Sequence, residues 1–387
     1  MSDVEADDEA HRSEPGPPLA SIVVNNYNYG RFVAEAIDSA LAQTYTPLEV
    51  IVVDDGSTDE SRDVIASYGD RIFPLLKENG GQASAFNAGF AACRGEVVVF
   101  LDADDVLLPT AIEQAMKQFT PGVAKVHWPL WRAGEDLEAS GQIIPAEPLP
   151  HGDLREFTLR QGPATSLSPP TSGNAWARNF LEIALPMPEP EHRIGADGYL
   201  YGTAPAFGTI ASLTTPQGFY RIHPRNNYKH MPLDERVRAG IRSFEQQWSM
   251  LEDHALRMGE PVNRQNWERN SYFHQVRRAV DEIVALVPAG DTIILVDEAR
   301  WAVGAEIAGR FVLQFLEKDG EYWGLPEDDT HAIAELERLR TERGAKTLAI
   351  AWPAFWWLAD YPQFAAHIRA NHACRLENER LIVFSLR

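Results

Sequence analysis

The chain has 387 residues, of which 44% are hydrophobic and 24% are charged, so it can fold around a large core. These proportions exclude a disordered, collagenous or disulfide-stapled protein. The formal net charge of −21 argues against sequence-independent nucleic-acid binding, because phosphate backbones would be repelled. The two cysteines, Cys93 and Cys374, form neither a disulfide framework nor a zinc motif, which is typical of a reducing compartment.

The N-terminal segment is predicted to be a disordered tail. Residues 1–19 contain six acidic residues and, towards their end, three prolines. The sequence has no run of 18 apolar residues and no basic stretch leading into an apolar one at its start. We therefore expect neither a transmembrane helix nor a signal peptide. The expected location is the cytoplasm, with a peripheral position at the inner face of the membrane left open.

Residues 20–110 alternate short apolar runs with helical patterns. This alternation predicts an α/β fold with a doubly wound, mostly parallel sheet. We expect strands at Ala20–Val24, Glu49–Val53, Arg71–Leu76 and Glu96–Leu101, and helices at Arg31–Gln43, Asp59–Tyr68 and Gln82–Ala92.

The pattern becomes less regular after Pro109, and residues 133–175 are expected to be mostly loop. The elements predicted here are helices at Ala111–Phe119, Arg178–Leu185 and Gly198–Ala206, and strands at Lys125–Arg132 and Gly218–His223. For His127 and Trp128 on the predicted strand, core packing is favoured over contact with a bound ligand, and both alternatives stay open.

The remainder of the chain predicts a charged helical linker from Asp234 to about Val287, followed by a small Rossmann-like domain. That domain lacks a Gly-x-Gly-x-x-Gly loop, so nucleotide binding there has little support. Its predicted strands are Thr292–Val296, Thr347–Ala351 and Leu381–Leu386, and its predicted helices are Ala302–Phe315 and Thr330–Arg343. The predicted division is a tail at 1–19, an α/β domain at 20–232, a linker at 233–287 and a C-terminal domain at 288–387.

The C-terminal domain contains five of the ten tryptophans and the pair Asp297 and Glu298 after a predicted strand. Packing of the tryptophans in a core or an interface is favoured over carbohydrate binding, which stays open. The two acids are a candidate second polar site. Docking of a partner, or formation of a homo-oligomer, is the expected role of this domain.

Three predicted strands end in polar groups, at Asn25–Asn28, Asp54–Ser57 and Asp102–Asp105. Ligands of open parallel sheets bind beyond the carboxyl ends of the strands. Five acids at two neighbouring strand ends repel one another unless a cation or hydrogen-bond donors compensate them. Because Mg²⁺ and Mn²⁺ prefer carboxylate oxygens and substrate phosphates, Asp102 and Asp104 are candidate ligands of a metal–diphosphate site.

Four stretches of the chain, in this order and at this spacing, resemble the family 2 glycosyltransferases, which are inverting enzymes with the GT-A nucleotide-sugar fold. They are Ser21–Asn28, Val52–Asp59, Glu78–Gln82 with Asn87–Gly89, and Phe100–Asp105, with a looser likeness at Tyr220–His223.

The resemblance implies roles for particular residues. Asp102, Asp104 and His223 correspond to the groups that hold Mn²⁺ or Mg²⁺, with Asp104 as the direct ligand and Asp105 in support. The positions that correspond to nucleotide-sugar contacts are Asn25, Tyr27, Asp55, Gly81, Asn87, Asp102 and His223. The family also places a catalytic carboxylate at the start of a helix beneath the acceptor. Asp197 corresponds to this general base, while Glu189 and Glu191 are rival carboxylates and a helix cap is the alternative role of Asp197.

The function that follows is transfer of a sugar, with inversion, from a nucleotide donor, expected to be UDP-linked, to a saccharide or lipid-linked acceptor. A sugar-nucleotide pyrophosphorylase would need a Gly-rich, basic loop after the first strand, which Asn25–Arg31 does not supply. The alternative outside enzymes is a catalytically degenerate GT-A protein that binds carbohydrate or acts as a scaffold.

Overall fold

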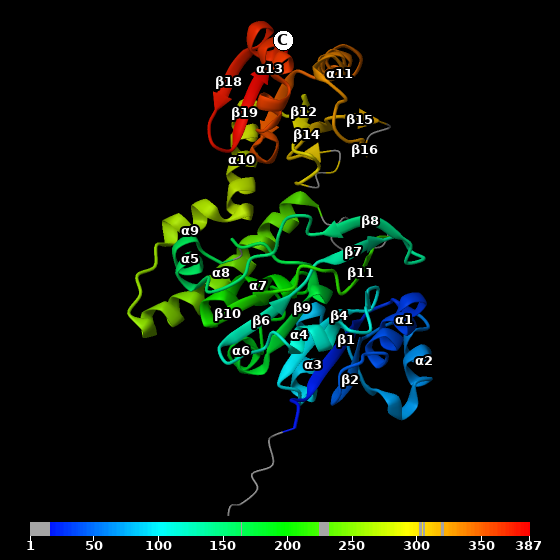
Figure 1. Ribbon diagram of the computed structural model, residues 1–387. Helices are drawn as coiled ribbons and strands as arrows, with labels where there is room; N and C mark the ends of the chain where they lie inside the picture. The colour runs from blue at the N-terminus through cyan, green and yellow to red at the C-terminus, as the bar shows by residue number, and fades with distance from the viewer. Residues whose placement is uncertain (1–15, 164, 224–231, 302–303, 305, 319–320) are drawn as a thin grey trace, which may run out of the picture. The chain divides into compact units, whose positions relative to one another are not determined.

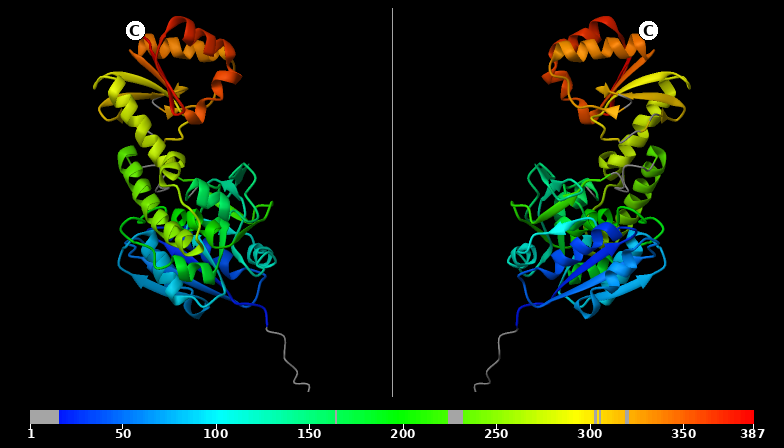
Figure 2. Two further views of the ribbon diagram at one scale, coloured as in Figure 1. Left: turned by 90° about the vertical axis from the view of Figure 1, so that its left-hand side faces the viewer. Right: turned by 90° about the vertical axis from the view of Figure 1, so that its right-hand side faces the viewer.

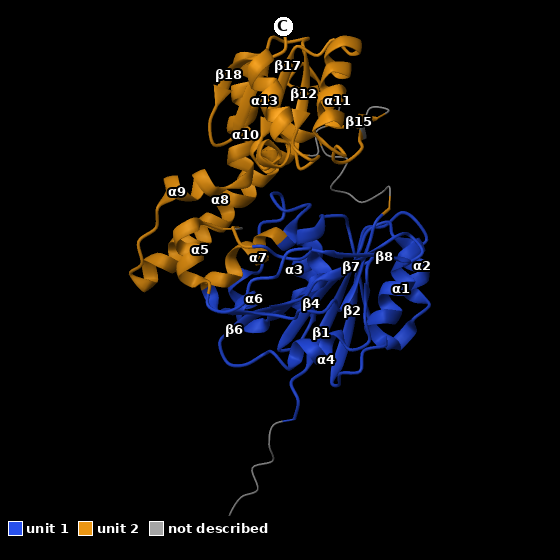
Figure 3. Cartoon of the chain, turned by 45° about the horizontal axis from the view of Figure 1, so that its top comes forward, with its two compact units in different colours: residues 1–153, 167–197, 207–222 blue, residues 154–166, 198–206, 223–387 orange. Residues whose placement is uncertain are grey.

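The computed structural model describes residues 16–163, 165–223, 232–301, 304, 306–318 and 321–387, so most of the predicted tail lies outside the described residues. The chain forms two compact units, which are coloured separately in Figure 3. Unit 1 comprises residues 1–153, 167–197 and 207–222, and unit 2 comprises residues 154–166, 198–206 and 223–387.

Unit 1 is built on a seven-stranded sheet in the order β10-β6-β9-β4-β1-β2-β3 (Figure 1). All neighbouring strands are parallel except β9, which runs antiparallel to both β4 and β6. The predicted α/β fold with a mostly parallel sheet is therefore confirmed. The strands are β1 (Ala20–Asn26), β2 (Leu48–Asp55), β3 (Phe73–Lys77), β4 (Val97–Asp102), β6 (Val123–His127), β9 (Asn174–Ala177) and β10 (Thr209–Ser212).

A smaller sheet in unit 1 has the strand order β5-β11-β7-β8. It contains β5 (Val106–Leu107), β7 (Leu130–Ala133), β8 (Ala139–Ile144) and β11 (Gly218–Arg221). The helices of unit 1 are α1 (Gly30–Leu41), α2 (Ser61–Ala66), α3 (Gln82–Ala92), α4 (Ala111–Met116) and α6 (Arg178–Ala184), and α7 (Ala196–Phe207) begins in this unit.

The two faces of the large sheet bury different side chains, because successive residues of a strand point to opposite faces. Val24, Val52 and Leu101 pack in one core cluster with residues of α1, α2 and α4. On the opposite face, α3 approaches so closely that a Cβ at Gly89 would lie 2.3 Å from Val23 Cγ1. Phe86 of α3 stacks on Phe100 of β4, with ring centroids 4.0 Å apart. Residues that follow Val23 and Phe100 by two positions therefore lie on the α3 face.

The predicted strand Lys125–Arg132 is wrong as a single element. It is divided at Trp128 and Pro129 into β6 of the large sheet and β7 of the small one. Pro129 has no backbone N–H for a continuous ladder, which explains the break. Residues 133–175 also contain more regular structure than expected, because β8, the short helix α5 (Arg155–Gln161) and the start of β9 lie there.

Unit 2 contains a set of helices and a second sheet. The helical pattern predicted from Asp234 to Val287 is confirmed by α8 (Leu233–Met258), α9 (Arg264–Asn270) and α10 (Tyr272–Leu286). The six-stranded sheet has the order β13-β14-β12-β17-β19-β18. Its strands are β12 (Thr292–Val296), β13 (Glu306–Ile307), β14 (Arg310–Gln314), β17 (Thr347–Ala351), β18 (Ala373–Glu377) and β19 (Leu381–Ser385). The remaining elements include β15 (Glu317–Lys318), β16 (Glu321–Tyr322), α11 (Asp329–Glu342), α12 (Trp357–Asp360) and α13 (Pro362–Asn371).

The predicted helix Ala302–Phe315 is wrong, because its described residues form the hairpin of β13 and β14. Ala308 and Gly309 have φ values of 47° and 79°, so the chain turns back between the strands. β14 then pairs in parallel with β12 and becomes a buried part of the sheet. A short apolar run fits a buried strand as well as a helix, and the pairing with β12 decides between them.

Among the helices that the structure describes, none is both long enough and apolar enough to cross a membrane.

Candidate active site

The polar ends of three strands meet at one edge of the large sheet. In the register of the sheet, Asn25 of β1 lies opposite Asp102 of β4 on one side and opposite Val53 of β2 on the other. Asn25 and Asp102 follow Val23 and Phe100 by two residues, so both lie on the α3 face. Asn25 is 9% exposed, and both polar atoms of its amide lack a hydrogen-bond partner among the residues that the structure describes. A buried amide of this kind offers one donor group and one acceptor to a ligand.

Asp54 and Asp55 are adjacent in sequence but lie on opposite faces of the sheet. Asp54 Oδ1 accepts a hydrogen bond from Asn26 Nδ2 at 2.9 Å, and its Oδ2 pairs with Arg62 Nε at 2.7 Å. Burial alone would raise the pKa of Asp54, but hydrogen bonds from Ser57, Arg62 and Asn26 hold it below the usual value. Asp54 therefore braces β1 and the start of α2 from the face opposite α3.

Asp55 holds the loop between β3 and α3. Its Oδ1 accepts from Lys77 Nζ at 2.6 Å and from the Gly80 N–H at 2.9 Å. Its Oδ2 accepts from the Gly81 N–H at 2.7 Å and from Asn79 Nδ2 at 3.1 Å. A carboxylate has about four lone-pair sites, and four donors already occupy them. A contact between Asp55 and a nucleotide, as expected from the sequence, would thus have to replace one of these bonds.

A cluster of acids follows β4. Burial raises the pKa of Asp102 well above its usual value, and the charges of Asp104 and Asp197 raise it further. Burial likewise raises the pKa of Asp105, with further contributions from Asp104 and Asp102. Three carboxylates at the end of β4 and one that is distant in sequence, Asp197, therefore interact electrostatically. We call Asp102, Asp104, Asp105 and Asp197 the acidic cluster.

The negative charges of the acidic cluster act on two tyrosine hydroxyls. Burial raises the pKa of Tyr29, and the charges of Asp104, Asp102 and Asp105 add to this effect. Burial also raises the pKa of Tyr220, followed by Asp105, Asp104 and other members of the cluster. Both hydroxyls therefore stay protonated and can donate hydrogen bonds near the carboxylates.

The loop after β4 is held by Ser172 and Arg221. Ser172 Oγ donates to Asp105 Oδ2 at 2.6 Å and accepts the Asp102 N–H at 3.2 Å. The Arg221 N–H donates to Asp105 Oδ1 at 3.0 Å, and its Nε donates to the Asp104 carbonyl at 2.7 Å. Arg221 is itself buried and pairs with Glu35 Oε2 at 2.6 Å. These contacts assign Asp105 a supporting position, with its two oxygens directed at protein groups.

Gln82 connects the acidic cluster with the start of α7. Its Oε1 accepts the backbone N–H groups of Gly195 and Ala196 at 2.9 and 3.0 Å. A hydrogen bond from the Gln82 side chain also acts on Asp102 and lowers its pKa, against the larger raising effects of burial and the neighbouring acids. The N-cap of α7 is Gly195, and Asp197 is the second residue of the helix. Asp197 is therefore not the N-cap residue that the alternative interpretation required.

Asp197 also lies near a buried cation. Burial lowers the pKa of Lys125 to about 7, and the charge of Asp197 opposes this effect. Lys125 Nζ donates to Ser168 Oγ at 2.7 Å and lies 5.2 Å from the ring centroid of Trp176. The half-buried Asp197 carboxylate thus interacts electrostatically both with Asp102 and with the amine of Lys125.

Asn87 and its neighbours hold a segment that lies far away in the sequence. Asn87 Oδ1 accepts the Met187 N–H at 2.9 Å, while Nδ2 donates to the Met187 carbonyl at 2.9 Å and to Glu189 Oε1 at 3.2 Å. Contact of Asn87 with a donor sugar would need one of these bonds to be released. Glu189 is exposed and Glu191 half-buried, and neither is among the main causes of the raised pKa of Asp102.

Gly81 has a backbone conformation and a neighbour that both require glycine. Its φ is 92°, and a Cβ would lie 2.7 Å from the Cα of Arg193. Gly122 has nearly the same φ, 91°, with nothing within 4 Å of its Cβ position.

We expect Gly81→Ala to lower the free energy of unfolding more than Gly122→Ala does. Gly122→Ala should cost about 1–2 kcal/mol for the left-handed conformation alone. Gly81→Ala should cost about 1–3 kcal/mol more, because the Arg193 backbone must move. Urea unfolding followed by tryptophan fluorescence measures both variants. Equal losses would show that the loop yields at Arg193 and that the contact is unimportant.

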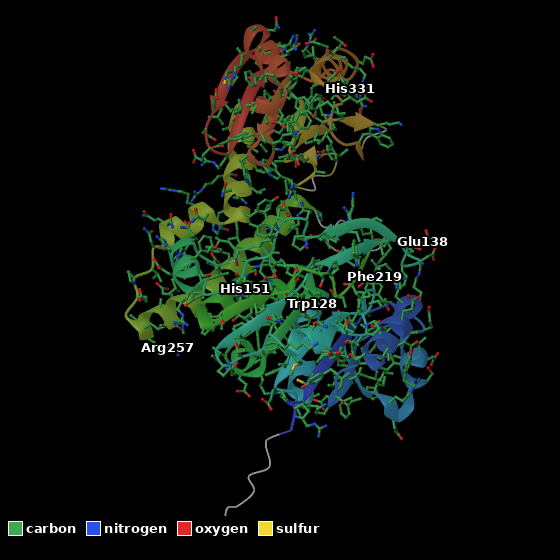
Figure 4. The ribbon with its side chains drawn as sticks, viewed as in Figure 1. Trp128, Glu138, His151, Phe219, Arg257 and His331 are labelled. Carbon is green, nitrogen blue, oxygen red and sulfur yellow. The ribbon has the colours of Figure 1, made fainter. Side chains whose placement is uncertain are left out.

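The other residues predicted for the site lie as follows. Tyr27 is 43% exposed, directly after β1. His223 is buried and belongs to unit 2, two residues beyond β11, so its role at a metal or diphosphate stays a prediction. His127 and Trp128, the latter labelled in Figure 4, are almost fully buried, which supports core packing for both.

The candidate polar site of unit 2 is a closed turn. Asp297 is fully buried, and its carboxylate accepts the N–H groups of Ala299 at 3.1 Å and Trp301 at 2.9 Å. Burial raises the pKa of Asp297 to about 6, and the two N–H groups oppose this. Trp301 and Trp357 are buried in the core, as favoured from the sequence, whereas Trp323 and Trp356 are exposed.

Comparison with known proteins gives matches at several levels. Residues 21–161 match the family model described as Glycosyl transferase family 2. An uncharacterised glycosyltransferase of Nostoc sp. is 41% identical over 267 residues, which cover 66% of this chain and 81% of the relative. An uncharacterised glycosyltransferase of Rickettsia prowazekii is 51% identical over 96 residues, which cover 25% of this chain and 30% of the relative. Among solved structures, S. aureus TarS 1–349 in complex with UDP has a TM-score of 0.47 and 15% identity, covering 70% of this chain and 75% of that chain.

Proposed function

The chain belongs to glycosyltransferase family 2, and we propose that it is an inverting enzyme of the GT-A fold that uses a divalent cation and a nucleotide-sugar donor. The donor we propose is UDP-linked, and the acceptor is a hydroxyl group of a saccharide or of a lipid-linked saccharide.

The observation that carries this proposal is the acidic cluster. Burial and the neighbouring carboxylates raise the pKa of Asp102 and of Asp105, and this arrangement is costly unless it serves a cation or a reaction. The donor set fits Mn²⁺ or Mg²⁺, since both prefer carboxylate oxygens together with substrate phosphates. We assign Asp104 and Asp102 as the protein ligands, with His223 as a further candidate. When bound, the cation would stabilise the negative charge on the departing diphosphate.

The protein groups around the cluster have separate tasks. The unpartnered amide of Asn25 is suited to a hydrogen-bonding group of the nucleoside, since it lies in register with Asp102. Tyr27 offers an exposed aromatic ring next to it. Asp55 and Gly81 shape the loop before α3, while Ser172 and Arg221 hold the aspartates that follow β4.

Asp197 is the proposed general base. It takes the proton of the acceptor hydroxyl as that oxygen attacks the anomeric carbon, which develops oxocarbenium character. Attack from the face opposite the departing diphosphate inverts the configuration, and no covalent intermediate is needed. Gln82 links the start of α7 to Asp102, so the position of the general base relative to the donor site is fixed.

Release of nucleoside diphosphate from a panel of UDP- and GDP-sugars tests the proposal. With Mn²⁺ present, we expect release from one UDP-sugar well above the rate without enzyme, loss of this activity in EDTA and recovery on adding Mn²⁺. A transferase that is not metal-dependent would keep its rate in EDTA. Preference for a GDP-sugar would overturn the assigned nucleotide while leaving the fold and the family unaffected.

A further inference from the structure

Three metal-ligating side chains converge in unit 2, on the helices that cover its sheet. Glu337 lies on α11, His367 lies on α13 and His372 directly follows α13. The two helices pack against each other, as Figures 1 and 2 show. Glu337 Oε1 is 3.2 Å from His367 Nε2 and 3.8 Å from His372 Nε2. One ligand atom from each residue lies within 4.8 Å of the other two.

His372 is the member of this group that a purely structural role does not explain. Its side chain is only 7% exposed, yet its buried Nε2 has no hydrogen-bond partner among the described residues, since Glu337 Oε1 lies 3.8 Å away. A buried nitrogen without a partner is costly, and a metal ion would satisfy it. The side chains of Glu337 and His367 are 32% and 26% exposed, which leaves a path to solvent for an entering ion and for a water ligand.

The surrounding residues orient two of the three groups. Arg340 Nε pairs with Glu337 Oε2 at 2.7 Å, so Oε1 is the oxygen that faces the histidines. Asn371 Nδ2 donates to His367 Nδ1 at 3.2 Å, which leaves Nε2 directed at Glu337. Hydrogen bonds to the far atoms of a ligand are a usual feature of metal sites, because they fix its orientation.

We propose that Glu337, His367 and His372 form a binding site for a divalent transition-metal ion, with Zn²⁺ as the best match. In a tetrahedral zinc site with bonds of about 2.1 Å, ligand atoms are about 3.4 Å apart. The two separations from Glu337 Oε1, 3.2 and 3.8 Å, are already close to this value. Two imidazoles and one carboxylate favour zinc over the hard cations that suit the acidic cluster of unit 1. The ion would join α11 to the junction of α13 and β18 and stabilise unit 2.

The test is a titration of the metal-free, full-length protein with Zn²⁺ by calorimetry, in excess Mg²⁺ to occupy carboxylate-only sites. We expect one Zn²⁺ per chain, a raised melting temperature and the visible spectrum of a tetrahedral complex when Co²⁺ replaces Zn²⁺. His372→Ala should weaken binding at least about tenfold and abolish this spectrum. The matched control is His331→Ala, which removes an exposed histidine of α11 outside the group and should change neither result.

If His372→Ala does not fold, Glu337→Gln serves instead, since it keeps the shape of a half-buried side chain and removes the anionic ligand. Equal Zn²⁺ affinity in wild type and the ligand variants would overturn the proposal, as would the absence of binding to a wild-type protein that is folded by circular dichroism. Equal weakening by His331→Ala would show that the histidines bind the ion without a defined site, which would also overturn it.

Discussion

Asp104→Ala should lower the rate of sugar transfer about 10³-fold, which corresponds to about 4 kcal/mol of transition-state stabilisation. The carboxylate is the proposed direct ligand of the cation that offsets the charge of the departing diphosphate, and such stabilisation is worth several kcal/mol. The fold should survive, because the loop is held through the Asp104 carbonyl and through Asp105 rather than by the Asp104 carboxylate alone. Release of nucleoside diphosphate from the preferred donor measures the effect.

The matched control for this variant is Asp70→Asn, which removes one negative charge from an exposed position in the same unit. It should keep the wild-type rate, since an exposed charge outside the site is largely screened. Mn²⁺ affinity, measured by calorimetry, should fall with Asp104→Ala and remain with Asp70→Asn. A folded Asp104→Ala variant that retains more than about a tenth of the activity would contradict the assignment of this ligand.

Much of the fold could be predicted because buried parallel strands are short, apolar and bounded by polar turns. β12 and β17 begin and end at the predicted residues, β1 is two residues longer than predicted, β2 is three residues longer, and β4 is shifted by one residue. The polar residues at the strand ends also allowed the position of the site to be predicted. Since parallel strands end at one edge, Asn25 and Asp102 had to lie close together once the sheet formed.

What failed depends on contacts between distant segments. β9 is a four-residue antiparallel strand inserted between β4 and β6, and nothing in its own sequence states that order. The hairpin of β13 and β14 was mistaken for a helix because only its pairing with β12 distinguishes the two.

The site residues that sequence reasoning missed act through similar long-range contacts. Gln82, which acts on Asp102, accepts hydrogen bonds from backbone groups 113 and 114 positions further along the chain than itself, and Arg221 holds a loop 116 to 117 positions away. Gln82 lies in the motif Glu78–Gln82, and Arg221 lies in the motif Tyr220–His223. These positions were the only indication in the sequence that either residue belongs to the site. For Lys77, which pairs with Asp55, the sequence contained no indication of a role in the site beyond a charge at the end of a strand.

Asp197→Asn should lower kcat about 10²- to 10⁴-fold, the usual contribution of a general base. Asparagine keeps the shape of the side chain at the second position of α7 but cannot accept the acceptor's proton. Glu189→Gln and Glu191→Gln are the matched controls, and each should stay within a few-fold of wild type. A larger loss in either one, or a folded Asp197→Asn variant with more than about a tenth of wild-type kcat, would move the base to another carboxylate.

Removal of the Asp197 charge also changes the acidic cluster, and this consequence separates catalysis from binding. The charge of Asp197 contributes, after burial and Asp104, to the raised pKa of Asp102. Asp197→Asn should therefore lower the pKa of Asp102, so that Asp102 ionises at lower pH and stays available to the cation. Donor KM and Mn²⁺ affinity should remain near wild type while kcat falls. A parallel loss of Mn²⁺ affinity would instead show that Asp197 is a metal ligand, because a base that acts only on the acceptor does not contribute to cation binding.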